Sequence, residues 1–131
     1  MKIAVVGSRS ITDKNLVISF MEECHLFNYD DDKIVSGGAR GVDTIAENYA
    51  KEHKMKTAIF KPDWDKYGKS AGMIRNADII GKCDKCICIW DGESNGTKND
   101  IELCEQMNKP CYILNTSTGE KIFPEENLFD F

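Results

Sequence analysis

The chain has 131 residues, 41% of them hydrophobic and 30% charged, a composition typical of one globular domain with a buried core. Its net charge of -5, from 22 acidic and 17 basic residues, disfavours binding along a nucleic-acid backbone, which depends on clustered lysines and arginines. No apolar run approaches the roughly 20 residues of a membrane span, and the first residues turn polar too soon for a signal peptide. We therefore expect a cytoplasmic protein that makes no membrane contact.

Short apolar runs alternate with amphipathic patterns in the first half of the chain. The strands predicted there are Lys2 to Val6, Lys33 to Ser36 and Lys56 to Phe60. One helix is predicted from about Asp13 to Leu26, and apolar residues at helical spacing predict another over Val42 to Ala50. Each strand in this half is therefore expected to be followed by a helix or a loop that leads into one.

The same alternation continues in the second half. A polar and aromatic loop, Pro62 to Lys69, precedes a helix that Ser70 caps and that extends to about Ile80. The elements predicted after it are a strand from Lys85 to Trp90, a loop from Gly92 to Thr97, a helix from Lys98 to Met107 and a strand from Cys111 to Leu114. We expect one domain over residues 1–114, with residues 115–131 forming a C-terminal tail that either docks on it or stays flexible.

Strands that alternate with helices predict a parallel sheet with helices on both faces. We expect an α/β protein with a Rossmann-like three-layer fold and about five parallel strands in the order 3-2-1-4-5. In that order the first, second and fourth strands are neighbours, and a glycine-containing loop leaves the carboxyl end of each. Ligands of such sheets bind outside these ends, so the three loops are predicted to converge on one crevice.

Glycine-rich loops at helix starts suit phosphate, because backbone N–H groups can approach it closely and the helix dipole is positive there. The residues predicted to bind phosphate are Gly7, Ser8, Arg9, Gly37, Gly38, Ala39, Arg40, Gly96 and Thr97. Each loop by itself is equally consistent with an ordinary strand–helix turn, and each arginine by itself with a solvated surface residue. The predicted convergence of all three loops favours a binding site.

Several further polar residues flank these loops. Asp43 either favours the dipole of its helix or fixes Arg40 or a ribose hydroxyl, while Trp64 is a candidate for stacking on a base. Arg75, Asn76 and Asp100 are candidates for binding the nucleotide, with Arg75 as phosphate clamp and Asp100 as ribose or acid–base partner. The alternative for Arg75 and Asp100 is a salt bridge between two helices.

The chain has six cysteines. Cys83-x-x-Cys86 is half of a common metal-site pattern, but no second such pair or pair of histidines accompanies it along the sequence. Cys86 and Cys88 fall in an apolar run, where a free cysteine behaves as a small hydrophobic residue. We therefore expect reduced structural thiols, with no metal site and no cofactor.

Motifs from several of these segments occur together in a known order. They are Val6-Gly7-Ser8-Arg9, Ser36-Gly37-Gly38-Ala39-Arg40-Gly41-Val42-Asp43, Asp63-Trp64, Tyr67-Gly68, Ala71-Gly72, Arg75-Asn76 and Ser94-Asn95-Gly96-Thr97. With them the chain resembles, over roughly Met1 to Leu114, the YspA-like (YpsA-related) branch of the SLOG superfamily. The resemblance implies a Rossmann-like fold, a nucleotide or NAD-derived ligand, and a homodimer or higher homo-oligomer.

The resemblance also extends to an enzymatic branch, the LONELY GUY phosphoribohydrolases, which cleave the N-glycosidic bond of nucleoside monophosphates. By this resemblance the arginine of that branch corresponds to Arg75. Its Gly-Gly-x-Gly-Thr-x-x-Glu motif corresponds to Gly96-Thr97-Lys98-Asn99-Asp100, with aspartate in place of glutamate and without the first two glycines.

Three functions follow, in order of preference. The first is binding of a small-molecule nucleotide by a sensor or sequestering protein, and the second is a phosphoribohydrolase that uses Arg75 and Asp100. DNA-processing protein A, another SLOG relative with a similar Ser-Gly-x-Ala-Arg-Gly-x-Asp stretch, binds single-stranded DNA. We rank DNA binding last because this chain is acidic and lacks that family's additional parts.

Overall fold

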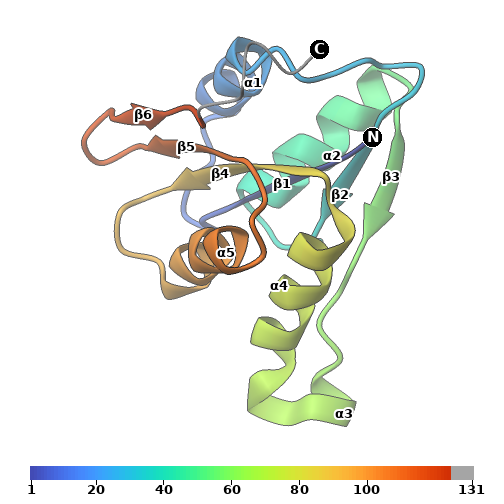
Figure 1. Cartoon of the computed structure of the whole chain (residues 1–131), viewed down its shortest axis with the longest axis vertical. Helices are drawn as coiled ribbons and strands as arrows, with labels where there is room; N and C mark the ends of the chain where they lie inside the picture. Colours follow the sequence, from blue (N-terminus) through green and yellow to red (C-terminus); the bar gives the residue numbers. More distant parts are fainter. Residues whose placement is uncertain (125–131) are drawn as a thin grey trace.

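The computed structural model describes residues 1–124, which form one six-stranded sheet flanked by helices (Figure 1). The strand order is β3-β2-β1-β4-β5-β6, and every pairing is parallel except that of β6 with β5. The strands are β1 (Lys2–Gly7), β2 (Lys33–Ser36), β3 (Lys56–Ile59), β4 (Lys85–Trp90), β5 (Cys111–Asn115) and β6 (Lys121–Ile122). This confirms the predicted α/β fold and the order of its first five strands.

Helices cover both faces of the sheet, as the crossovers between parallel strands require. The helices are α1 (Lys14–Glu23), α2 (Val42–Glu52), α3 (Trp64–Tyr67), α4 (Ala71–Lys82) and α5 (Asn95–Gln106). Side chains of α1 and α2 share one apolar cluster with one face of the sheet, and side chains of α4 and α5 share a second cluster with the other face. Within residues 1–124, no helix combines the length and the apolar character needed to cross a membrane.

The two central strands, β1 and β4, are buried on both faces. Their side chains alternate between the two clusters, with Ile87 and Ile89 on the side of α1 and α2, and Cys86 and Cys88 on the side of α4 and α5. A strand buried on both faces needs apolar residues at every position. This requirement explains the unbroken apolar runs in the sequence.

The start of α5 differs from the prediction. The helix begins at Asn95 instead of Lys98, because the Ser94 side chain caps it by accepting a hydrogen bond from the Thr97 N–H. Gly96 and Thr97 therefore lie in the first turn of a helix, where the prediction of a loop over Gly92 to Thr97 was wrong.

The end of α1 and the segment before α4 also differ from the prediction. Helix α1 ends at Glu23 instead of about Leu26, and His25 just beyond it has a φ of 53°. A left-handed residue at this place ends a helix. The predicted loop from Pro62 to Lys69 contains the helical turn α3, capped by Asp63, and leads into a 3₁₀ turn over Gly68–Ser70. Ser70 precedes α4 as predicted, but its side chain makes no capping hydrogen bond.

Part of the predicted tail pairs with the sheet. Lys121 and Ile122 form β6, antiparallel to β5, and the ring of Phe123 lies 5.9 Å from that of Phe20. A two-residue strand is too short to produce a periodic signal in the sequence. Residues 125–131 of the predicted tail lie outside the described part of the chain.

Candidate functional site

The loops that leave β1, β2 and β4 meet at the carboxyl edge of the sheet, around a cavity of about 480 Å³. Residues from all three loops and from α4 line it, and this volume is in the range of small-molecule sites. The predicted site residues among its lining are Gly7, Arg9, Ala39, Arg40, Asp43, Arg75, Asn76, Gly96, Thr97 and Asp100. Segments far apart in the sequence are thus brought to one place.

A second hollow, of about 680 Å³, adjoins the first and shares Arg9, Arg40 and Arg75 with it. It is lined by Gly37 and Gly38 after β2 and by Trp64 at the start of α3. The Trp64 side chain is 54% exposed, although a large aromatic residue usually packs in the core. An exposed indole beside a hollow can accept a planar ligand by stacking.

Ser8 lies beneath the cavity and is buried. Its hydroxyl lies 3.3 Å from that of Thr97 and accepts a hydrogen bond from the Asp91 N–H at 3.1 Å. Ser8 therefore braces the loop after β1 against α5 and the end of β4, and it lines neither the cavity nor the second hollow.

Gly37 and Gly96 differ in the space that surrounds them. A Cβ on Gly37 would lie 2.6 Å from Nη1 of Arg75, so glycine is required there for the guanidinium to occupy its place. A Cβ on Gly96 would meet no atom within 4 Å, although this residue lines the cavity. The fold therefore leaves room for a side chain at residue 96, and a ligand could occupy the same space.

Arg75 joins the loop after β2 to α5. Its Nη1 donates to the Gly37 carbonyl at 2.7 Å, and its Nε donates to Oδ1 of Asn76 at 2.9 Å. Asn76 in turn donates to the Gly96 carbonyl at 3.4 Å. Among the described residues Arg75 and Asp100 form no salt bridge, so the alternative of a plain interhelix ion pair does not apply.

Two buried carboxyls, Asp43 and Asp100, line the cavity beside Arg75. One oxygen of Asp43 accepts a hydrogen bond from the Ala39 N–H at 3.2 Å, which ties the loop to the first turn of α2. The Oδ1 atoms of both residues have no hydrogen-bond partner within the described chain. Since buried polar atoms are almost always satisfied, these two enclosed oxygens are exceptions among the side chains around the cavity.

The surroundings of these carboxyls separate their pKa values. Burial, with a contribution from the Asp43 carboxylate, raises the pKa of Asp100 to about 8 against the opposing charge of Arg75. Burial raises the pKa of Asp43 to about 6, although the Ala39 N–H and the Arg75 guanidinium favour its charged form. Near neutral pH Asp100 therefore carries a proton and Asp43 is mostly ionised.

These raised pKa values predict a dependence of stability on pH. A carboxyl whose pKa is higher in the folded state binds its proton more tightly there than in the unfolded state. Its contribution to folding stability is therefore full below its ordinary pKa of 3.8, and this contribution is lost as the pH rises through the folded-state pKa. Through Asp100, the free energy of unfolding should fall between about pH 4 and about pH 8. Urea unfolding across this range should show a flatter profile for Asp100→Asn than for the unchanged protein, and parallel profiles would contradict the raised pKa.

Sequence reasoning missed two charged residues of the site. Asp91 directly follows β4 and lines the cavity, where its carboxylate accepts from the Ser94 N–H at 2.8 Å and from the Ser10 hydroxyl at 2.8 Å. Lys61 follows β3 by two residues and lines the second hollow. Both follow the carboxyl ends of strands, a position in the sequence that could have identified them.

Among the described residues, one cluster of three or more side chains could hold a metal ion. It consists of the thiols of Cys86, Cys88, Cys104 and Cys111. None of the four lines the cavity or the second hollow.

Sequence comparison places the chain among known proteins. The family model described as "YspA, cpYpsA-related SLOG family" matches residues 1–67. The gene 61 protein of Mycobacterium phage D29 is 28% identical over 116 residues, which are 83% of this chain and 92% of that protein.

Solved structures similar to this one include DNA processing protein A from two bacteria. The protein from Helicobacter pylori, whose single-stranded DNA binding mode has been described, has a TM-score of 0.69 and 24% identity over 92% of this chain and 68% of that chain. The Streptococcus pneumoniae protein has a TM-score of 0.68 and 20% identity over 98% of this chain and 52% of that one, so this chain spans about half of it. The X-ray structure of TM1055 has a TM-score of 0.66 and 21% identity over 90% of this chain and 75% of that chain. These similarities confirm the Rossmann-like fold.

Proposed function

Because the chain belongs to the YspA, cpYpsA-related SLOG family, we propose that it binds a small nucleotide in the cavity at the carboxyl ends of β1, β2 and β4. One juxtaposition carries the proposal: exposed arginines line the same cavity as two buried carboxyls, each with an oxygen that lacks a partner in the described chain. Arginine suits phosphate, and a carboxyl oxygen suits a ribose hydroxyl. The cavity therefore offers complementary groups to both halves of a sugar phosphate.

The phosphate is assigned to the side of the cavity where α2 begins. Gly41, the N-cap of this helix, provides no side-chain acceptor for the first backbone N–H groups, and the positive end of the helix dipole favours an anion on this side. Arg9 and Arg40 are exposed beside it, and Trp64 in the adjoining hollow is the residue proposed to stack on the base. Asp43 and Asp100 would then accept hydroxyls of the ribose.

Replacing Arg40 by alanine is expected to weaken binding by about 1.5–3 kcal/mol, the value of hydrogen bonds to a charged group. The measurement is isothermal titration calorimetry with AMP, GMP, CMP, UMP and ADP-ribose, carried out on both proteins. Lys51→Ala, at the far end of α2, is the control and should bind as the unchanged protein does. If none of these nucleotides binds, or if Arg40→Ala binds with unchanged affinity, the assignment of phosphate to this edge is wrong.

A second candidate function is hydrolysis of the N-glycosidic bond of a nucleoside 5′-monophosphate. The observation that favours it is the pair of cavity carboxyls with separated pKa values, because a protonated and an ionised carboxyl are the partners that acid–base catalysis needs. The bond from ribose C1′ to the base nitrogen would break, and its electron pair would leave with the base. Asp100 would protonate that base, and water activated by Asp43 would add to C1′, leaving free base and ribose 5-phosphate.

Chromatography of the same nucleotides after incubation with the protein separates the two functions. Released base supports the hydrolase, whereas saturable binding without released base supports a sensor or sequestering protein.

Single-stranded DNA is the ligand of the Helicobacter pylori relative, but we do not extend it to this chain. The relative shares the fold at 24% identity, and the net charge of -5 opposes a long polyanion. A mononucleotide needs positive charge only at one point of the surface.

A further inference from the structure

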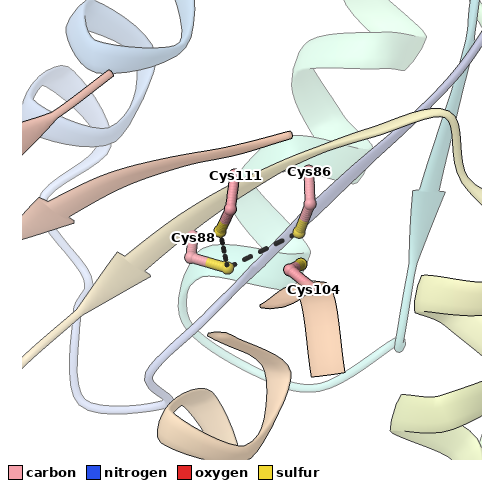
Figure 2. Close-up of side chains that lie close together, drawn as sticks. All are labelled: Cys86, Cys88, Cys104 and Cys111. Atoms are coloured by element: carbon pink, nitrogen blue, oxygen red, sulfur yellow. Dashed lines mark hydrogen bonds between the residues drawn. The ribbon is translucent and has the colours of Figure 1, made fainter. Parts of the chain in front are cut away.

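Four cysteine side chains from three elements converge between the sheet and α5 (Figure 2). Cys86 and Cys88 are alternate residues of β4 and share one face, and Cys111 on β5 is paired in register with Cys86. Cys104 extends from α5 toward the same point. All four sulfur atoms lie within 4.8 Å of one another, with 3.5 Å between Cys86 and Cys88 and 3.4 Å between Cys88 and Cys111.

We propose that these four thiolates form a tetrahedral site for one Zn²⁺ ion. A zinc ion bonded to four sulfurs at about 2.3 Å separates each pair of sulfurs by about 3.8 Å, which agrees with the observed spacing. Zinc is a common ion at tetrahedral four-sulfur sites. An iron–sulfur cube attaches its thiolates to four separate irons, farther apart than the ligands of a single ion, so the compact group favours one ion.

Packing alone does not explain why the sulfurs point to a common centre. Cys83 is equally buried and lies nearby at the end of α4, yet its sulfur contacts the Ile80 carbonyl at 3.3 Å instead of the group. A cysteine that only fills space needs no sulfur neighbours. Cys83 thus shows how an ordinary buried thiol behaves in this core.

The charge of such a site has a counterpart nearby. One Zn²⁺ with four thiolates carries two negative charges, which are costly to bury unless a cation offsets them. Lys109 lies between Cys104 and Cys111 in the sequence, and its partly buried ammonium donates to the Cys83 carbonyl at 2.8 Å. The positive charge of Lys109 would lower the free-energy cost of burying the negatively charged zinc site.

The site is closed, which assigns it a structural role. Cys86, Cys88 and Cys104 are at most 1% exposed and Cys111 is half-buried; four thiolates fill all positions of a tetrahedral ion, so none is open for a substrate. The ion would tie β4 and β5 to α5. Cys104 lies one helical turn beyond Asp100, so the same tie would hold the first turns of α5, which line the nucleotide cavity.

This proposal revises the expectation of reduced thiols without metal. Along the sequence Cys83 forms a metal-site pattern with Cys86, and no second pair accompanies it. The fold leaves Cys83 out and adds Cys104 and Cys111 from other elements, so a complete set of four ligands does not require a second pair along the sequence.

The test is metal analysis and Co²⁺ titration of the full chain under reducing, oxygen-free conditions. We expect about one zinc per chain as purified, and after its removal about one Co²⁺ per chain with the visible bands of tetrahedral thiolate coordination. Cys88→Ser and Cys111→Ser should each lower Co²⁺ affinity about tenfold or more, because losing a ligand costs at least what losing an outer-shell partner costs. Cys83→Ser is the matched control and should retain the full spectrum.

The readout requires no nucleotide, so it is independent of the proposed binding function. If the serine variants do not fold, as judged by circular dichroism, the unchanged protein still decides the matter, because adding Zn²⁺ to the metal-free form should raise its melting temperature. No bound metal and no Zn²⁺-dependent melting shift would overturn the proposal. Equal Co²⁺ binding by the serine variants would overturn it too, as would a disulfide among the four cysteines in the purified protein or a different metal at one per chain.

Discussion

Under the hydrolase proposal, replacing Asp100 by asparagine is expected to reduce release of free base by about 10²–10⁴-fold, the usual contribution of a positioned proton donor. Asparagine has nearly the same shape, and it can still receive a ribose hydroxyl, but it has no acidic proton to give to the leaving base. Binding of nucleoside monophosphates should therefore change much less than turnover. Base release, measured by chromatography, and affinity, measured by calorimetry, distinguish the two effects.

The pH profile adds a second readout for Asp100. Turnover by the unchanged protein should rise as Asp43 ionises near pH 6 and fall as Asp100 loses its proton near pH 8. The alkaline fall should be absent from any residual activity of Asp100→Asn. Asp78→Asn, on an exposed residue of α4, is the control and should behave as the unchanged protein.

Three outcomes are informative. Turnover by Asp100→Asn at the normal rate would remove Asp100 from the chemistry. Absence of turnover in the unchanged protein, with binding intact, would reject the hydrolase and leave the nucleotide-binding proposal standing. Loss of both binding and folding in the variant would assign Asp100 to stability instead.

The second large effect is expected at Gly96. Valine at this place should weaken nucleotide binding about tenfold to a hundredfold, since overfilling a packed site costs about 1–3 kcal/mol. The fold should tolerate it, because a Cβ at residue 96 meets no atom within 4 Å and the residue lies in the first turn of α5. Calorimetry with the nucleotide that binds most tightly, together with circular dichroism, measures both parts.

Gly81→Val provides the matched control for Gly96→Val. Gly81 also lies in a helix with open space around a Cβ, but it does not line the cavity or the second hollow. Its variant should bind normally. If Gly96→Val binds as well as Gly81→Val does, the ligand does not approach the backbone of α5, and Gly96 is not part of the site.

Local patterns were sufficient to predict the fold. The unbroken apolar run from Cys86 to Ile89 predicts a strand buried on both faces, and regular alternation with helical spacing predicts the parallel crossovers. The convergence of the loops at Gly7, Gly38 and Gly96 follows from strand order alone. At the start of α5 local prediction failed because of one side chain: Ser94 caps the helix three residues earlier than expected.

The sequence by itself thus determined the five parallel strands, their order and the edge of the sheet where a ligand would bind, because these depend on periodicity and on crossover handedness. Only the tertiary structure decided that Asp43 and Asp100 are buried beside Arg75, that Gly37 makes room for this arginine, and that Cys104 and Cys111 join Cys86 and Cys88. Burial and the contacts of distant residues arise when layers pack against each other. The spacing of residues along the chain does not encode them.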